Sequence, residues 1–242
     1  MKVAWKSDRG RVRENNEDSV LVDKELGLLL VADGMGGHNG GEIASRMAVT
    51  SIAETMRAGL EKATTNEQLA ALIHNAVVAA DAEIRSRATT EPALQGMGTT
   101  LVLALVRDGM VHIAHAGDSR AYLIRNTKIQ QLTEDHSLAV QAEKTGTKLR
   151  WPGRRPALRN MITRSLGNQV AVEEEYQLVA AKPGDVLVLC TDGLSNLVDQ
   201  KDIRKIVLRD STDFEQSCRE LVDLANERGG QDNISVIVAQ AS

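Results

Sequence analysis

The stretch "VADGMGGHNGG", residues 31–41, ends an apolar run with an acidic residue and opens a glycine-rich loop. The residues alone leave three interpretations open. An Asp-Gly pair is common hairpin chemistry, a glycine-rich loop can cradle an anion, and a carboxylate beside glycines can bind a metal ion. Evidence from the rest of the chain is needed to choose among them.

The chain contains three Asp-Gly pairs, which begin at Asp33, Asp108 and Asp192. Asp108 separates two apolar runs that need a reversal, "LVLALVRDGMVHIAHA", so a hairpin turn accounts for it and we assign it no chemistry. Asp33 and Asp192 differ, because each follows an apolar strand and precedes a loop that leads toward a helix. These two aspartates are candidates for a functional site.

The alternation of side chains along a strand links four aspartates to apolar columns. Asp33 and Asp192 follow such columns, whereas Asp18 and Asp232 precede them. A helix cap or a turn explains any one of these acids, but four in the same phase favour a shared site. We expect all four to point inward and, in an antiparallel arrangement, to meet at one edge of the core. The columns are Leu29 and Val31; Val188 and Cys190; Val20 and Val22; and Ile234, Val236 and Val238.

Converging carboxylates need a counter-charge. Two of them about 4 Å apart repel by roughly 4 kcal/mol at an effective dielectric near 20. Oxygen ligands without clustered Cys or His favour Mg²⁺ or Mn²⁺ over zinc. The anion cradle is the weaker interpretation, because no Gly-Lys-Ser/Thr follows and a glycine is missing from the dinucleotide-binding pattern. Residues 31–41 therefore favour a metal site.

Apolar periodicity predicts helices at 41–60, 66–87, 137–145, 199–209 and 213–228. Strands are predicted at 19–22, 26–32, 99–106, 110–116, 121–124, 129–132, 170–179, 185–191 and 233–240. Most helices come in consecutive pairs between groups of strands, unlike the strict alternation of a parallel sheet. The sequence thus predicts an α+β fold in one domain, residues 1–242, with helix pairs packed on mainly antiparallel sheet.

Composition narrows the class of protein. Hydrophobic residues make up 42% of the 242 residues and aromatic residues only 2%, which predicts a sizeable aliphatic core. A net charge of −4 argues against a general nucleic-acid binder. No stretch approaches the roughly 20 apolar residues of a membrane helix, and the first residues lack the centre of a signal peptide. With Cys190 and Cys218 expected to be reduced, we expect a cytoplasmic monomer without membrane or nucleic-acid partners.

Eight segments, in family order, resemble the metal-dependent PP2C (PPM) family of protein serine/threonine phosphatases in its compact bacterial form. The resemblance implies a sandwich of two antiparallel sheets flanked by helix pairs, with metals at one end and a flap at about 137–165. The segments are "RENNED" (13–18), "VADGMGGHNGGEIAS" (31–45), "GMGTTLV" (96–102), "AGDSRAYL" (116–123), "LTEDHS" (132–137), "ITRSLG" (162–167), "LCTDGLSN" (189–196) and "GGQDNISVIV" (229–238).

The resemblance also implies metal ligands. Asp33 is similar to the carboxylate that bridges two metals, and Gly34 to the carbonyl ligand beside it. Asp192 and Asp232 match the acids that complete the second metal's shell. Asp118 matches the ligand that, with Asp192, holds a third ion in many bacterial members.

Further residues are implied to act on water and phosphate. Glu17 and Asp18 match acids that orient metal-bound water, and Arg13 matches the residue that grips the substrate phosphate. Two Mg²⁺ or Mn²⁺ ions would lower the pKa of a bridging water, and the hydroxide would attack phosphorus directly. The expected substrates are phosphoserine and phosphothreonine in proteins, so the enzyme would reverse the action of bacterial serine/threonine kinases. The alternatives are a non-catalytic phosphoprotein-binding module, although no metal acid is missing, and a nucleotide-binding enzyme.

Two features depart from the family pattern. Met35 stands where eukaryotic relatives carry a histidine thought to protonate the leaving alkoxide, which leaves metal-bound water, His38 and His136 as candidates for the acid. The segment after Ser137 carries basic residues with no intervening acid. It is either a solvated basic loop or a flap that attracts acidic, phosphorylated substrate segments. These residues are Lys144, Lys148, Arg150, Arg154, Arg155, Arg159 and Arg164.

Overall fold

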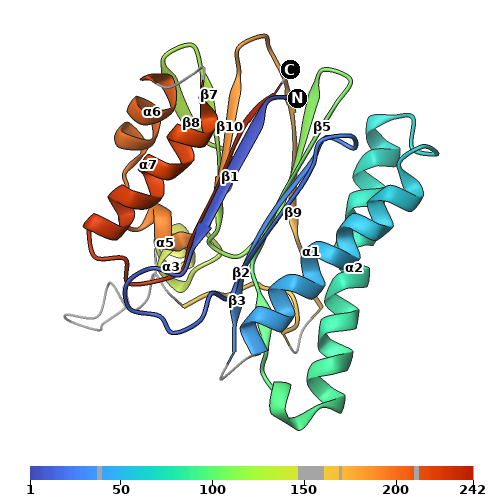
Figure 1. Cartoon of the computed structure of the whole chain (residues 1–242). Coiled ribbons are helices and arrows are strands. Elements are labelled where there is room, and N and C mark those ends of the chain that lie inside the picture. Colours follow the sequence, from blue (N-terminus) through green and yellow to red (C-terminus); the bar gives the residue numbers. More distant parts are fainter. Residues whose placement is uncertain (37–39, 147–160, 169–170, 210–212, 242) are drawn as a thin grey trace.

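A computed structural model describes residues 1–36, 40–146, 161–168, 171–209 and 213–241, and within them two antiparallel sheets stack face to face (Figure 1). The first sheet has the strand order β1-β11-β10-β7-β8. Its inner strand β11 comes last in the chain and pairs with both β1 and β10. The strands are β1 (Val3–Asp8), β11 (Ile234–Gln240), β10 (Val186–Cys190), β7 (Arg120–Arg125) and β8 (Lys128–Gln131).

The second sheet has the order β2-β3-β5-β6-β9, and the short strand β4 pairs with the end of β3. Its strands are β2 (Asp18–Asp23), β3 (Leu28–Met35), β4 (Gly98–Thr99), β5 (Leu101–Arg107), β6 (Met110–Ala116) and β9 (Glu175–Ala180). Residues 28–32 of β3 are all buried, because one face of this strand meets the other sheet and the opposite face meets helices. This explains why β3 reads as a continuous apolar run.

Helices cover the outer face of each sheet (Figure 1). On the second sheet lie α1 (Gly40–Gly59) and α2 (Asn66–Thr90), whose start is fixed by a capping box between Thr65 and Gln68. On the first sheet lie α6 (Gln200–Arg209) and α7 (Phe214–Glu227). Three shorter helices lie in the connections between the larger elements: η1 (Pro92–Leu94), α3 (Leu138–Thr145) and α5 (Asp192–Ser195).

The predicted fold class is confirmed, with three local corrections. The sequence reading missed strand β1, and it began the strand after the flap too early, because β9 starts only at Glu175. Asp192 does not precede a loop but is itself the first residue of α5. The Asp108 hairpin is confirmed: this residue lies between β5 and β6 with a positive φ of 50°, and its side chain is 84% exposed.

Two other expectations concern chemistry and location. Cys190 and Cys218 are both buried and free, as the sequence predicts. Among the helices of the described segments, none combines the length and apolar character needed to span a bilayer. Most of the predicted flap, residues 147–160, lies outside the described residues.

Candidate metal centre

Four of the predicted acids gather where β2 begins, β3 ends and α5 starts. Asp18 and Asp33 are directly opposite each other in the register of β2 and β3. Asp192 begins α5 immediately after β10, and Asp232 lies two residues before β11. The side chains of Asp33 and Asp192 are close enough to share a hydrogen bond. The opposite strand ends therefore meet at one edge, as the sequence predicts.

The four apolar columns were predicted to face the inside of the sandwich. This direction is right for the columns next to Asp18 and Asp33 and wrong for those next to Asp192 and Asp232. The columns that end in Asp18 and Asp33 line the core between the sheets. The columns next to Asp192 and Asp232 face α6 and α7 instead, because Val188 and the residues in phase with it pack under these helices. Both acids lie outside the regular strands, where the chain turns and strand alternation no longer fixes side-chain direction. They reach the site through these turns.

Burial and mutual repulsion raise the pKa of the clustered acids. Burial is the largest cause for Asp33, followed by the charges of Asp18, Asp192 and Asp232, and its pKa lies well above the ordinary range. Burial and neighbouring carboxylates also raise the pKa of Asp192. Asp118 belongs to the cluster as well, since burial and the charge of Asp192 raise its pKa to about 7. Such a group of carboxyls is electrostatically poised for a cation.

Asp18 is held by hydroxyl groups as well as by burial. The Thr191 hydroxyl donates to its Oδ2 at 3.0 Å, and the Ser235 hydroxyl provides a second hydrogen bond. These bonds lower the pKa, but burial outweighs them and raises it to about 7. Asp18 is therefore fixed in position beside Asp33.

Unsatisfied oxygens test whether the site fits a metal. Oδ1 of Asp18, Asp118 and Asp192 is buried in each case and has no hydrogen-bond partner among the described residues. A buried acceptor without a partner costs about 1–3 kcal/mol, and more when it is charged. Hard divalent cations such as Mg²⁺ and Mn²⁺ take carboxylate oxygens as ligands, so the donor set fits the ions that the sequence predicts.

Two glycines allow the separate segments to approach. A Cβ on Gly34 would clash with the backbone carbonyls of Gly41 and Glu17, and the Gly34 N–H donates to the Glu17 carbonyl at 3.2 Å. A Cβ on Gly193 would clash with the carbonyl of Asn233. Neither glycine has a positive φ, so both are required for space and not for an unusual backbone conformation.

Arg13 and Glu17 lie on the loop between β1 and β2. The Arg13 guanidinium donates from Nη2 to Oδ2 of Asp232 at 2.8 Å, and this bond raises its pKa. Half of the Arg13 side chain remains exposed. Burial raises the pKa of Glu17, whose carboxylate packs against Gly41 at the start of α1. The structure thus places both residues at the edge of the cluster.

Sequence reasoning missed Asn233, which fixes this loop. Its amide nitrogen donates to the carbonyls of Arg9 and Asn15 at 2.9 and 2.8 Å. Its Oδ1 accepts from the backbone N–H of Glu17 at 2.8 Å. The only sequence signal was an amide next to Asp232 in "GGQDN", a pattern that a simple turn also explains. Asn233 therefore joins the loop that carries Arg13 to the segment that carries Asp232.

His136 was a candidate general acid, but its ring is engaged elsewhere. Nδ1 accepts from the Gly117 N–H at 3.2 Å, and Nε2 lies 3.2 Å from Glu175. The ring stacks on His115, whose Nε2 lies 2.9 Å from the carbonyl of Glu134. These three side chains come close enough to ligate a metal, but His136 Nδ1 and His115 Nε2 already contact backbone groups, and His136 Nε2 faces Glu175 without a hydrogen bond. We assign them to bracing the turn before Asp118. His38, the other candidate, lies outside the described residues.

The basic residues of the predicted flap are described only at its two ends. Lys144 pairs with Glu134 at 2.7 Å, and Arg164 pairs with Glu175 at 3.3 Å. These two cations are thus offset by acids that come from outside the basic run. Lys148, Arg150, Arg154, Arg155 and Arg159 lie outside the described residues.

Comparison with known proteins adds independent evidence. A family model described as protein phosphatase 2C matches residues 9–239. The serine/threonine phosphatase stp of Listeria monocytogenes is 35% identical over 243 residues, which cover 99% of this chain and 96% of that protein. The serine/threonine protein phosphatase PstP of Mycobacterium tuberculosis is also 35% identical, over 99% of this chain and 45% of PstP.

Solved structures agree with the fold. The crystal structure of PstP/Ppp from Mycobacterium tuberculosis matches with a TM-score of 0.86 at 35% identity, covering 99% of this chain and 97% of that one. A structure of the PstP catalytic domain in complex with two manganese ions matches with a TM-score of 0.84 over the same shares. Fold, ordered motifs and sequence identity along almost the whole chain agree, and the chain belongs to the protein phosphatase 2C family.

Proposed function

We propose that the aspartate cluster holds two divalent ions with which this chain hydrolyses phosphoserine and phosphothreonine in proteins. As a member of its family, the chain is a metal-dependent protein serine/threonine phosphatase. The assignment of the ions to particular residues rests on one observation above all. Three buried carboxylate oxygens from distant parts of the sequence lack a partner among the described residues, and they lie in one cluster.

Each ligand has a proposed place in the metal site. Asp33, the Gly34 carbonyl, Asp192 and Asp232 would hold the two ions, with Asp33 as the ligand common to both. Asp118 and Asp192 would hold a third ion. This last assignment is supported by the buried, unpartnered Oδ1 of Asp118. Either Mg²⁺ or Mn²⁺ suits this set of hard oxygen donors.

The ions, when bound, lower the pKa of a water molecule to near neutrality and offset the charge of the phosphate. The side chains of this protein supply the rest. Arg13 orients phosphate oxygens with the guanidinium nitrogens that Asp232 does not hold. Glu17 and Asp18 orient the attacking water, a role that the buried and unpartnered Oδ1 of Asp18 supports.

The proposed partners are phosphorylated proteins, namely serine/threonine kinases or their substrates. The proposed location of this chain is the cytoplasm, and its proposed oligomeric state is a monomer. Two free, buried thiols are consistent with a reducing compartment. A phosphoprotein-binding module without activity is the alternative class, and it is disfavoured because every predicted metal acid is present. Phosphoproteomics of a deletion strain would identify targets as sites whose phosphorylation rises. No change at any Ser or Thr site would contradict the assignment of partners.

The direct test uses purified protein with Mn²⁺ and two substrates, p-nitrophenyl phosphate and a phosphothreonine peptide. We expect turnover of both, loss on adding EDTA, and loss in Asp192→Ala. Asp108→Ala is the matched control, because this second Asp-Gly aspartate lies far out on a hairpin and should keep full activity. Calorimetric titration with Mn²⁺ should show at least two sites in the wild type and fewer in Asp192→Ala. Activity that survives EDTA would refute the metal assignment.

A further inference from the structure

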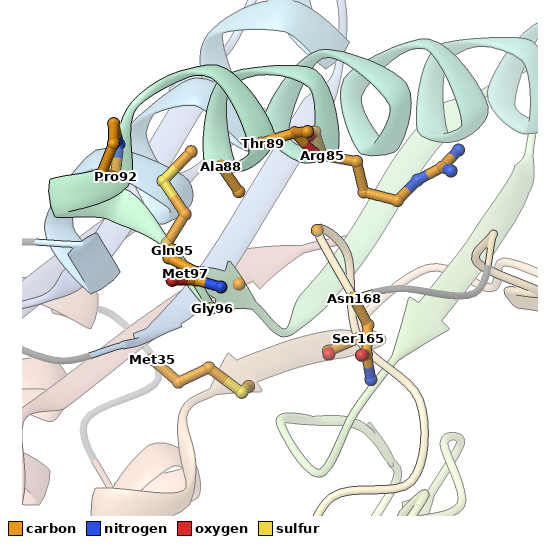
Figure 2. A pocket seen from close by; sticks show the side chains of 12 residues that line it. Met35, Arg85, Ala88, Thr89, Pro92, Gln95, Gly96, Met97, Ser165 and Asn168 are labelled. Atoms are coloured by element: carbon orange, nitrogen blue, oxygen red, sulfur yellow. The ribbon is translucent and has the colours of Figure 1, made fainter.

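A large pocket lies beside the metal centre and has no role in the chemistry described above. Its volume is about 800 Å³, within the range of pockets that bind ligands. Figure 2 shows α2 running along the top of this pocket and Met35 lying below, with Ser165 and Asn168 on the side away from Gln95. We call it the α2 pocket; Met35, Arg85, Gln95, Gly98, Ser165 and Asn168 are among its lining residues.

The α2 pocket is continuous with the strands that position the central aspartate. Gly34 pairs with Thr99, and Met35 pairs with Gly98, so the pocket floor is the strand partner of the metal-binding segment. The Thr99 hydroxyl donates to the carbonyl of Asp33 at 2.9 Å. A polypeptide whose phosphate lies at Asp33 therefore reaches this pocket by continuing past Met35, and an extended chain covers roughly 3.3–3.6 Å per residue.

The wall of the pocket is built into the fold. Leu166 pairs with Thr99 through two backbone hydrogen bonds of 3.0 and 2.9 Å. Asp81 on α2 is 1% exposed and accepts from the Gly167 N–H at 2.8 Å and from the Val172 N–H at 3.2 Å. This buried carboxylate ties the wall to α2, so the pocket is a fixed hollow between two braced elements.

Charge separates this side of the metal centre from the opposite side. A smaller pocket of about 270 Å³ is lined by four acids and one cation: Asp118, Asp135, Glu143, Asp192 and Arg120. None of the twelve lining residues of the α2 pocket carries a carboxylate, and one of them is Arg85. The α2 pocket therefore offers an acidic substrate segment a path without carboxylates and with one cationic side chain, whatever ions the acidic pocket holds.

Arg85 gives this path a specific preference. Its Nε donates to Oδ2 of Asp81 at 2.9 Å, and its two terminal nitrogens have no protein partner among the described residues. A third of the Arg85 side chain is exposed. A guanidinium fixed at one nitrogen and open at two others is preorganised for a carboxylate.

We propose that the α2 pocket receives the substrate polypeptide next to the phosphorylated residue and that Arg85 selects an acidic side chain there. The inference rests on the proposed function, since it takes the aspartate cluster as the site of the phosphate. It assigns to this enzyme phosphoprotein substrates in which an acidic residue flanks the phosphorylated serine or threonine.

The first test blocks the pocket. Gln95 is exposed on its rim, and Ala93, in the same short helical turn, is exposed but does not line it. In Gln95→Trp we expect the ratio of kcat/KM for a phosphothreonine peptide to kcat/KM for p-nitrophenyl phosphate to fall at least about tenfold, mainly through KM. Ala93→Trp should keep the wild-type ratio. An unchanged ratio in Gln95→Trp, in an enzyme that turns over both substrates, overturns the inference and leaves the proposed function standing.

The second test reads the charge preference. A set of phosphothreonine peptides carries Asp, Ala or Lys at each flanking position in turn. We expect the wild type to favour Asp over Lys at one position by about fivefold, the size of an exposed ion pair, and Arg85→Gln to lose this preference. Arg87→Gln is the control, because Arg87 lies on the same helix and pairs with Glu91 outside the pocket. A preference that persists in Arg85→Gln, or none in the wild type, refutes the role of Arg85. Wild-type protein that cleaves neither substrate refutes the proposed function itself.

Discussion

The same dipeptide, Asp-Gly, does different work at the β5–β6 hairpin and at the metal centre. At the hairpin, Asp108 and Gly109 both have positive φ, and a Cβ on Gly109 would meet nothing within 4 Å. At the metal centre, Gly34 and Gly193 have ordinary φ values but no space for a Cβ. The hairpin needs glycine for its backbone conformation, and the metal centre needs glycine for close approach.

The aspartates differ in the same way. The Asp108 side chain lies almost entirely in solvent. Within the described residues its one ion pair is with its neighbour Arg107, at 3.4 Å. Asp33 is surrounded by four other aspartates, and their charges raise its pKa. An acidic residue is therefore informative about chemistry only together with its surroundings. Four changes, from the largest expected effect to the smallest, test this contrast.

Asp33→Asn should have the largest effect. The substitution keeps the size of the side chain but removes the charge that faces the ions, and we expect kcat/KM to fall by at least about a thousandfold. The same change relieves repulsion within the cluster, so the melting temperature in EDTA should rise. Phosphatase assays and thermal denaturation check the two halves. A variant that loses activity and also stability in EDTA would show that Asp33 holds the fold together instead of a metal.

Gly34→Ala and Gly193→Ala should destabilise the protein by about 2–4 kcal/mol, because each new methyl group meets a backbone carbonyl that cannot move freely. Gly109→Ala should cost less, about 1–2 kcal/mol, since it meets only the conformational penalty of a positive φ. Urea denaturation of the three variants gives this order. Equal losses of unfolding free energy in the three variants would contradict the distinction between glycines required by lack of space and a glycine required by its positive φ.

Stabilisation by Mn²⁺ should increase from pH 6 to pH 8. The pKa values of Asp18 and Asp118 are raised to about 7, so in the absence of an ion the folded state holds protons that the unfolded state releases near pH 4. The contribution of these two carboxyls to stability without metal therefore falls as pH rises, whereas an ion must displace their protons to bind. Below pH 7, Mn²⁺ affinity should drop by about tenfold or more per pH unit.

The measurement is the difference in melting temperature between samples with Mn²⁺ and samples with EDTA at each pH. Taking this difference removes the contribution of buried histidines such as His112, whose lowered pKa acts in both samples. Asp108→Asn should reproduce the wild-type pH dependence, since this exposed carboxylate is remote from the cluster. A difference that is flat between pH 6 and 8 contradicts proton–metal competition.

Asp108→Asn should have the smallest effect. Asparagine tolerates the same positive φ and forms the same turn, so we expect a change in unfolding free energy within about 0.5 kcal/mol and unaltered activity. Urea denaturation and the peptide assay measure both. A loss of activity here would mean that the hairpin contributes to function, against the contrast drawn above.

Sequence patterns predicted much of this structure because they reflect local physics. The apolar run of β3 and the spacing of α2 are long, and the turn at Asp108 has a strong signature. Strand β1 was missed because "VAWKSD" is short, carries charges and leaves Trp5 54% exposed at the edge of its sheet. Edge strands carry weak patterns, since one side has no neighbour.

The sequence predicted which acids belong to the site, but not the turns and contacts that orient them. Asp192 and Asp232 were identified, yet their direction is set by turns outside β10 and β11, which strand alternation cannot describe. Asn233 and the α2 pocket depend on segments far apart in the chain: Asn233 lies 218 residues from Asn15, and Gly167 lies 86 residues from Asp81. Contacts of this kind leave no periodic trace in the sequence.

The position of β11 has a consequence for the order in which the first sheet can assemble during synthesis. This strand follows every other described strand in the sequence, yet it lies inside the first sheet between β1 and β10. During synthesis β1 therefore has no partner strand until residues 234–240 have emerged, and Arg13 cannot contact Asp232 before Asp232 itself is made. A chain released before Asp232 should thus have an incomplete metal site and no phosphatase activity.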